Sequence, residues 1–273
     1  MMRNSRETVN VSEERRIWLQ TGRKRRVYIT VCQWSILFII IILWEFLAVV
    51  GVIDSFLVSC PSRIVKTLLN TAENGLMTHI GVTVYETLVG FGLGVVFGVI
   101  TAILLWWNEY VAKIAEPYLV VLNSLPKIAL GPIIILIAGA GTRAIIFMAL
   151  AISLIVTILE MLSGFNSCDS EHIKMAKTFG ATRRQIFIKV VFPSTLPTLF
   201  NSLKINIGLS LVGVIAGEFL VSRAGLGYLI VYGGQVFKMD LVMASVIILA
   251  LVAGVMYKGI ALIRKPIDKR FGP

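Results

Sequence analysis

Seven ionisable side chains interrupt the long apolar runs of this sequence. They are Glu45, Glu86, Lys127, Glu160, Lys204, Glu218 and Lys258. A charged group at membrane depth is costly unless it is paired or hydrated, so such residues by default indicate a polar site or route inside an apolar body. Two of the lysines lie near the ends of their runs, where a long side chain can reach the interface. The others are candidates for chemistry within the apolar layer.

Lys127 and Glu218 are the strongest of these candidates. Lys127 lies between Pro126 and Pro132, and prolines break helices and free backbone hydrogen-bonding groups. A cation among such groups can attract an anionic solute. Pro126, Lys127 and Glu218 are therefore predicted to line or gate a translocation pathway. The alternative is a structural role, as an ion pair or an inter-helix hydrogen bond.

A polar, basic stretch at 171–197, within a loop at about 164–198, is the second feature with chemical meaning. A helix is expected to start near Glu171 with Ser170 as its cap, and a turn is expected at Phe179, Gly180 and Ala181, where glycine permits a left-handed backbone. A second helix is predicted at 182–190 and is expected to end at Pro193. Two short helices joined by a tight corner form a rigid knob, which can fit a cleft in a partner. The alternative is a basic loop lying on anionic lipid.

Several function classes are excluded by what the sequence lacks. It contains no phosphate-binding G-x-x-x-x-G-K-[ST], no G-x-S-x-G and no H-E-x-x-H, so no catalytic role is predicted and any ATP must be bound by another chain. Three distant cysteines and two histidines predict neither a disulfide framework nor a metal site, and no cofactor is expected. The net charge of +11 does not indicate nucleic acid, because the basic residues flank apolar runs.

The elements that carry these residues are membrane-spanning helices. Hydrophobic residues make up 57% of the chain and charged residues only 15%, against about 25% charged residues in soluble domains. A span needs about 20 apolar residues. Six spans are predicted, at 29–51, 82–107, 116–138, 143–163, 201–221 and 240–263, with the third kinked or broken near Pro126. The first is expected to be an uncleaved span, preceded by a cytoplasmic tail at 1–28, and residues 29–270 are expected to form one transmembrane domain.

The distribution of basic residues predicts the orientation. With both termini inside, twenty of the 26 basic residues lie in cytoplasmic segments and five lie outside. Cytoplasmic segments of membrane proteins are enriched in Lys and Arg, so cytoplasmic termini are expected, and the segment 164–198 then also faces the cytoplasm.

Glycines recur every four residues in the second span, at Gly90, Gly94 and Gly98. Small residues at this spacing let helices approach closely. Packing within one subunit and contact with a second copy are both compatible with the pattern.

Four stretches together resemble the permease subunits of ABC importers, closest to the nitrate/sulfonate/taurine type. They are Pro61-Ser62, the segment 125–132, the segment 171–193 with Ala176-x3-Gly180 and Phe192-Pro193, and Gly217-Glu218-Phe219-Leu220 followed by Gly225-Leu226-Gly227-Tyr228. The resemblance runs from about residue 60 to 270. Lys174-Met175-Ala176 stands where the family has E-A-A, and Phe192 stands where it has Leu.

The resemblance implies an all-α membrane protein with the type I ABC importer permease fold and cytoplasmic coupling helices. The segment 164–198, called the coupling loop from here on, would dock a separate ATPase subunit. The docking residues it implies are Glu171, Lys174, Ala176, Lys177, Thr178, Phe179, Gly180, Ala181 and Arg183. The implied partners are an ATPase dimer, a second permease copy as in a homodimer, an extracytoplasmic substrate-binding protein and the lipid bilayer.

The function implied is the import of a small anionic solute, such as a sulfonate, nitrate, taurine or a vitamin precursor, across the bacterial inner membrane. A secondary transporter is the alternative, but that class usually shows inverted repeats and paired broken helices, whereas one broken helix is visible here. A membrane-embedded enzyme would need clustered His, Asp or Glu residues.

Overall fold

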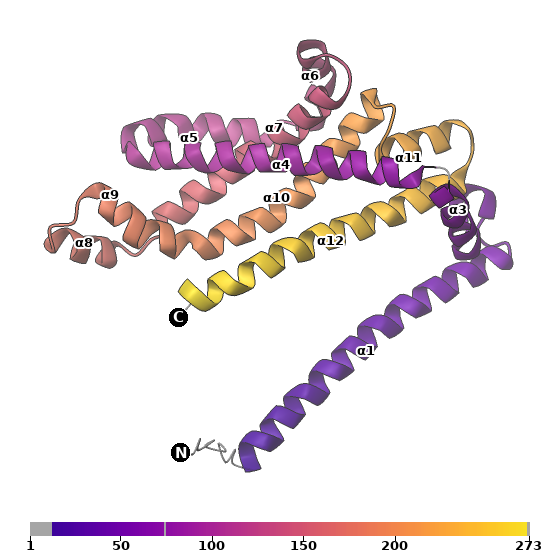
Figure 1. Ribbon diagram of the computed structural model, residues 1–273, viewed down its shortest axis with the longest axis horizontal. Coiled ribbons are helices and arrows are strands. Elements are labelled where there is room, and N and C mark those ends of the chain that lie inside the picture. Colours follow the sequence, from indigo (N-terminus) through magenta and orange to yellow (C-terminus); the bar gives the residue numbers. More distant parts are fainter. Residues whose placement is uncertain (1–12, 74, 272–273) are drawn as a thin grey trace, which may run out of the picture. The chain divides into compact units, whose positions relative to one another are not determined.

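The computed structural model describes residues 13–73 and 75–271, and these ranges are helical apart from short connections (Figure 1). Twelve α-helices and two other helical turns are present in the described ranges. They are α1 (Glu13–Val49), α2 (Ser55–Val58), α3 (Pro61–Glu73), α4 (Leu76–Trp107), α5 (Glu109–Ser124), a 3-10 turn (Lys127–Leu130), α6 (Gly131–Ala138), α7 (Thr142–Asn166), α8 (Ser170–Thr178), α9 (Arg183–Ile186), a π turn (Phe187–Val191), α10 (Phe192–Val221), α11 (Leu226–Gln235) and α12 (Met239–Phe271).

The chain divides into two compact units, Met1–Arg63 and Ile64–Pro273. In the first unit, α1 runs unbroken through the predicted boundary between residues 28 and 29, and its segment Val27–Val49 is long and apolar enough to cross a membrane. Residues 1–12 of the predicted cytoplasmic tail lie outside the described residues.

Glu45, on α1, binds the start of α3 within the first unit. Its carboxylate accepts hydrogen bonds from the backbone N–H of Ser62 (3.0 Å) and from the Ser62 hydroxyl (2.8 Å). The helix begins at Pro61, because proline suits the first helical position and Glu45 satisfies the free N–H that a cap would otherwise serve. Glu45 therefore has a structural partner.

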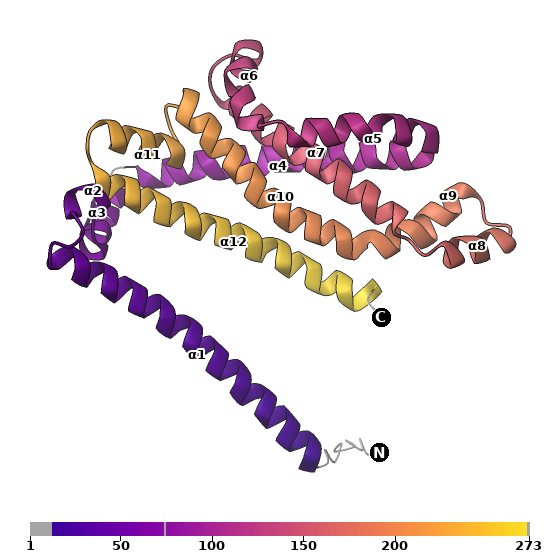
Figure 2. The ribbon, with the colours of Figure 1, turned by 180° about the vertical axis from the view of Figure 1, so that it is seen from behind.

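The second unit is built around α4, α7 and α10, which pack side by side (Figures 1 and 2). The glycine stripe of α4 lies inside this bundle. A Cβ added at Gly90 would overlap Ala149, one at Gly94 would overlap Ser153, and one at Gly98 would meet Thr157. Of the two roles that the spacing allowed, the stripe serves packing between α4 and α7 of the same subunit.

Within the part of the chain that the structure describes, five helices are long and apolar enough to span a membrane, and a sixth span results if one bent pair is counted as one. That pair is Glu109–Ser124 and Lys127–Ala138, bent by 85°. The break therefore lies where proline was expected to place it, although the helix before it starts at Glu109, earlier than the predicted 116. Helix α11 falls in a segment for which no helix was predicted.

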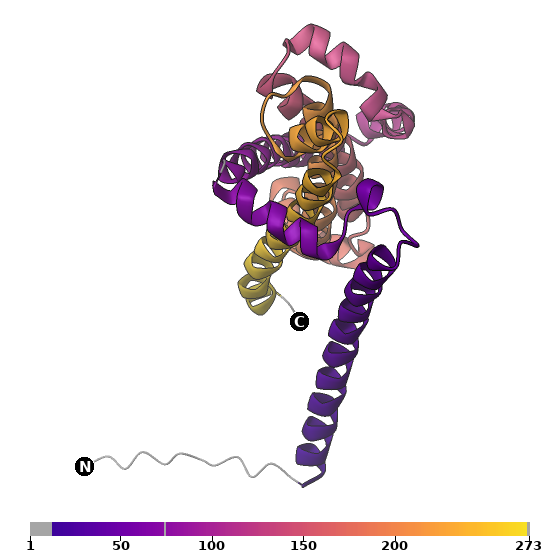
Figure 3. The same cartoon turned by 90° about the vertical axis from the view of Figure 1, so that its right-hand side faces the viewer.

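The two ends of the second unit differ in what they carry. The α8–α9 segment projects at one end, and the carboxyl half of α12 lies on the same side (Figures 1 and 2). A hydrogen bond of 3.1 Å from Arg264 to Asn201 joins α12 to the beginning of α10 on this side. The opposite end, which faces the viewer in Figure 3, carries α11 and the loop before it.

Candidate functional site

The knob predicted within the coupling loop is present and is closed by local hydrogen bonds. The N–H of Gly180 donates to the carbonyl of Lys177 (2.9 Å) and the N–H of Ala181 donates to that of Ala176 (3.0 Å), which together form a Schellman motif. Gly180 has a φ of 77°, in the left-handed region that this motif needs at its glycine position. The turn is therefore encoded by a local sequence signal.

Two caps define the helices on either side of this turn. Asp169, and not the predicted Ser170, accepts the N–H of Glu171 (2.8 Å) at the start of α8. At α9, the N–H of Thr182 donates to the Gln185 side chain (2.8 Å), and the N–H of Gln185 donates to the Thr182 hydroxyl (3.4 Å). This reciprocal capping box holds the corner in one conformation.

The predicted end of the second helix at Pro193 is wrong. Helix α9 passes into the π turn Phe187–Val191, which continues directly into α10. The N–H of Phe192 donates to the carbonyl of Phe187, five residues back. Pro193 lies in the first turn of α10, where a backbone N–H would have no acceptor within the helix, so the N–H that proline lacks is not missed. The knob is therefore joined to α10 without a flexible link.

The inner face of the knob packs on an apolar and aromatic core. Ile173, Ala176 and Ala181 lie against the cluster that contains Phe165 and Phe187. The Phe187 ring is also 5.0 Å from that of Trp106 and 5.9 Å from that of Trp107, between ring centres. Ala176 and Ala181, predicted as docking residues, thus face their own subunit and position the others.

Arg183 fastens the knob to the end of α4. Its Nη2 donates to the carbonyl of Trp106 (3.2 Å), and its guanidinium carbon lies 5.4 Å from the centre of the Trp106 ring. A cation over an indole is favourable, and the hydrogen bond satisfies a carbonyl near the helix terminus. The predicted docking residue Arg183 therefore already has a structural role.

The outer face of the knob is exposed. Phe179 is 83% exposed and Met175, one turn before it, is 56% exposed. Around them lie the remaining predicted docking residues, all exposed: Glu171, Lys174, Lys177, Thr178 and Gly180. Sequence reasoning missed Met175 on this face, although its spacing of four residues from Phe179 places both on one side of a helix.

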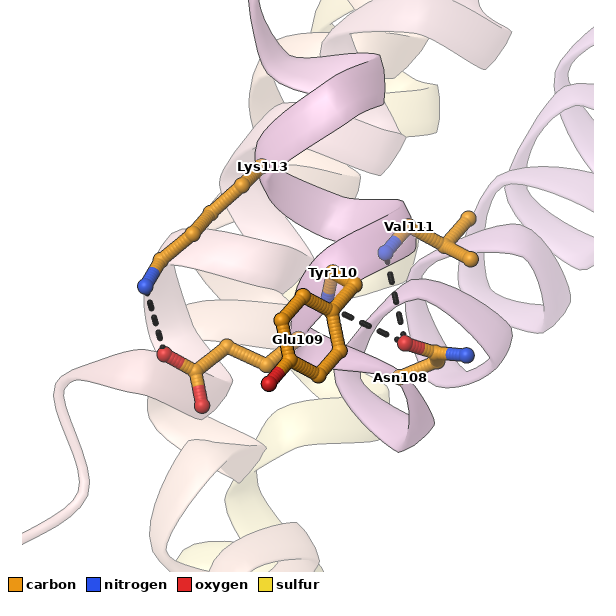
Figure 4. Close-up of polar contacts among 5 residues, drawn as sticks. All are labelled: Asn108, Glu109, Tyr110, Val111 and Lys113. Carbon is orange, nitrogen blue, oxygen red and sulfur yellow. Dashed lines mark hydrogen bonds and ion pairs between the residues drawn. The ribbon is translucent and has the colours of Figure 1, made fainter.

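The turn between α4 and α5 borders the knob and is also capped (Figure 4). The Asn108 side chain accepts the N–H groups of Tyr110 (3.1 Å) and Val111 (3.3 Å), while Lys113 and Glu109 form an exposed ion pair of 2.7 Å. A cavity of about 670 Å³ lies beside this turn and reaches Arg183. Its charged lining includes acidic and basic residues together, so it has no preference for one sign of charge.

The structure separates the predicted pathway residues. Lys127 is partly exposed, and its ammonium donates to the backbone carbonyl (2.8 Å) and side-chain oxygen (3.3 Å) of Asn123, across the break at Pro126. Glu218 is only 2% exposed and accepts hydrogen bonds from Thr83 and Gly227. No ion pair joins Lys127 to Glu218 among the described ion pairs.

Known proteins share this fold. A chain of the MetNI methionine ABC transporter, in an inward facing conformation, has a TM-score of 0.63 and 20% identity to this chain, covering 70% of this chain and 95% of its own. A chain of a bacterial ABC transporter that imports alginate has a TM-score of 0.60 and 16% identity, covering 92% of this chain and 99% of its own. The fold is that of type I ABC importer permeases.

Sequence relatives agree with the fold. The formylaminopyrimidine transport permease protein ThiX of Halalkalibacterium halodurans is 31% identical over 173 residues, which cover 63% of this chain and 69% of that protein. The taurine transport system permease protein TauC of Escherichia coli is 24% identical over 221 residues, which cover 78% of this chain and 80% of that protein. The family model for binding-protein-dependent transport system inner membrane components matches residues 94–272, which is more than half of this chain. The chain therefore belongs to this family, the permease subunits of ABC importers.

Proposed function

We propose that this chain forms part of the transmembrane route of an ATP-driven importer and that its coupling loop docks a separate ATPase subunit. The knob at 170–186 carries this proposal, because it is rigid, continuous with α10 and exposed on its outer face. Exposed aromatic residues on a rigid support are typical anchors of protein interfaces. Phe179 is the anchor that this arrangement favours.

The proposed mechanism is alternating access. ATP binding would close two ATPase subunits and bring two coupling loops together, and the helix bundles of two permease copies would turn from inward-facing to outward-facing. A rigid connection from the knob into α10 supports the transmission of such a movement. The substrate-binding protein would then release its solute into the route, and hydrolysis would reset the transporter.

We propose a second permease copy because α6 has an exposed apolar face. Leu136 is 85% exposed and Ile137 is 82% exposed, which a lipid surface or another helix would have to cover. A homodimer places two broken helices next to a shared route. Pro126 and Lys127, at the break, are proposed to line it, whereas the buried Glu218 is suited to gating it from inside the subunit.

The substrate is proposed to be a small anionic solute. Relatives carry the names of taurine and aliphatic sulfonate permeases, and another is named for a formylaminopyrimidine, a candidate vitamin precursor. The partly exposed ammonium of Lys127 is the feature of this chain that favours an anion. The orientation proposed is a multi-pass inner-membrane protein with cytoplasmic termini.

The docking proposal is tested by replacing Gly180 with tryptophan. The residue has positive φ and no atom within 4 Å of an added Cβ, so the variant strains the turn and alters the outer face without disturbing the core. We expect normal membrane insertion but loss of ATPase co-purification and of stimulated ATP hydrolysis.

The matched control is Gly75→Trp. Gly75 also has positive φ (90°) and free space, but it precedes α4 and lies outside both the coupling loop and the proposed contact of α6 with a second copy. Normal ATPase coupling in Gly180→Trp, or an equal loss in both variants, would contradict docking through the knob. If the wild-type chain binds anionic lipid through the coupling loop but binds no ATPase, the alternative that this loop lies on the membrane surface would be favoured.

A further inference from the structure

Helix α3 lies between two segments that are each long and apolar enough to cross a membrane. The segment Val27–Val49 precedes it, and the span that begins at Leu76 follows it. The chain therefore stays on one side of the membrane between these two crossings. With the bent pair counted as one span, α4, the bent pair and α7 then separate α3 from the coupling loop. In the proposed orientation, α3 is on the outer side.

The packing of α3 keeps it at the level of the bilayer. On its inner face, Ile64 is only 2% exposed, and Leu68 packs against an apolar cluster that also contains Ile248 of α12. Ile248 is near the middle of the stretch between Asp240 and Lys258, which contains no charged residue. An uncharged helical stretch of this length crosses the hydrocarbon layer, so α3 is held beside a spanning segment and does not stand far out in water.

The other side of α3 carries an apolar stripe next to a polar one. Val65 is 56% exposed and Leu69 is 67% exposed, and their spacing of four residues places them together. Lys66 and Asn70, also exposed, form the adjacent polar stripe. The apolar face of α3 is thus wider than the part that packs on its own subunit. A helix with this arrangement, held beside a bilayer, is typical of the membrane interface.

The turn between α11 and α12 shows a second mark of the same boundary. The N–H of Lys238 donates to the carbonyl of Gly233 (2.8 Å) and the N–H of Phe237 to that of Gly234 (3.3 Å), which form a Schellman motif. Phe237 has a φ of 55° at the position where glycine is usual, and it is 66% exposed. The span of α12 begins at Met239, directly after this pair. An aromatic residue and a lysine at the end of a span commonly mark the membrane–water boundary.

We propose that α3 and the turn at Phe237 bind phospholipid of the outer leaflet. Val65, Leu69 and Phe237 insert between lipids just below the headgroups. Lys66 is exposed and forms no ion pair among the described ion pairs, so its ammonium is available to lipid phosphates while its stem lies along the apolar stripe.

The level of α3 favours lipid over a soluble protein as the occupant of this stripe, because its inner face packs beside a spanning segment. The inference goes beyond ATPase docking and the transported solute. It depends on the proposed orientation only for the name of the leaflet.

Spin labels on the full chain in phospholipid nanodiscs test the proposal. Single cysteines replace Val65, Leu69, Lys66 or Asn70 in a background in which the three native cysteines are serine. Collisions of each label are measured with oxygen, which concentrates in lipid, and with a water-soluble nickel chelate. We expect the ratio of oxygen to nickel collisions to be severalfold higher for Val65→Cys and Leu69→Cys than for Lys66→Cys and Asn70→Cys. The polar stripe is the matched control, because it lies on the same turns of the same helix.

Two results would overturn lipid binding by α3. Equal ratios at all four positions, with frequent nickel collisions, would show that the apolar stripe lies in water. Rare collisions with both reagents at Val65→Cys and Leu69→Cys would show that protein, such as a second copy of this chain, covers the stripe. Phe237→Cys should give a ratio as high as that of Leu69→Cys, and a ratio as low as that of Asn70→Cys would remove the turn from the lipid-binding surface.

Discussion

At the scale of single residues, three of the charges placed within apolar runs have a local reason in the structure. Glu45 satisfies the start of α3, and Glu218 satisfies the start of α11. Lys127 donates to a carbonyl of Asn123, one of the groups that the break after α5 leaves without a helical partner. The sequence showed that such charges need partners, whereas the partners themselves are seen only in the fold.

The role of Lys127 can be tested by Lys127→Met, with Lys127→Arg as the matched control. If Lys127 lines the route, the methionine variant should assemble and reach the membrane in normal amounts but lose uptake of the labelled solute. The arginine variant should keep part of that uptake, because a cation remains at the break. Immunoblots of membrane fractions measure the amount of each variant. Uptake of the labelled solute is measured in cells that express the whole transporter.

Two results would change this interpretation of Lys127. Normal uptake by Lys127→Met at normal expression would remove it from the proposed pathway. Reduced expression of Lys127→Met, with normal uptake per molecule, would assign the ammonium to the structural contact with Asn123 alone.

At the scale of elements, the close approach of α4 and α7 depends on glycines in one register. Gly94 is buried, and a Cβ there would collide with Ser153, whereas an added Cβ at Gly92 meets nothing within 4 Å. The two positions lie in the same helix and differ only in the face they occupy.

We therefore expect Gly94→Leu to destabilise the protein strongly and Gly92→Leu to be tolerated. Forcing a side chain into a packed interface typically costs about 1–3 kcal/mol, and the collision with Ser153 places Gly94→Leu at the upper end of that range or above it. Thermal unfolding of the purified chain in detergent measures the difference. Equal midpoints for the two variants would show that α4 and α7 can separate without loss of stability.

At the scale of the whole molecule, the coupling loop and the carboxyl half of α12 lie at one end of the second unit, and α11 lies at the other (Figures 1 and 3). Helix α10 runs from the end with the coupling loop to the end with α11, and α12 runs back. The excess of basic residues favours the first end as the cytoplasmic one.

Cysteine labelling of intact cells tests this orientation. In a background without Cys32, Cys60 and Cys168, a cysteine at Thr178 should be shielded from an impermeant thiol reagent, while one at Lys238, exposed near the α11 end, should react. Permeabilised cells provide the control, since both positions should then be labelled. Labelling of Thr178→Cys alone in intact cells would reverse the proposed orientation.

The sequence by itself determined those features that depend on neighbouring residues. Apolar runs of membrane length, the break at Pro126 and the turn at Gly180 all follow from the conformational limits of short segments. The cap of α8 is Asp169, one residue before the predicted Ser170, because several residues near a helix start can satisfy its free N–H groups.

Only the tertiary structure decided which buried groups meet. Thr83 and Glu218 are 135 positions apart, and no local pattern links them, so the cap on α11 could not be foreseen. The same applies to the aromatic base of the knob, where Trp106 meets Phe187, and to the partner of the glycine stripe. A buried polar atom must find a partner, but its identity depends on how whole helices pack, because packing brings distant segments within hydrogen-bond distance.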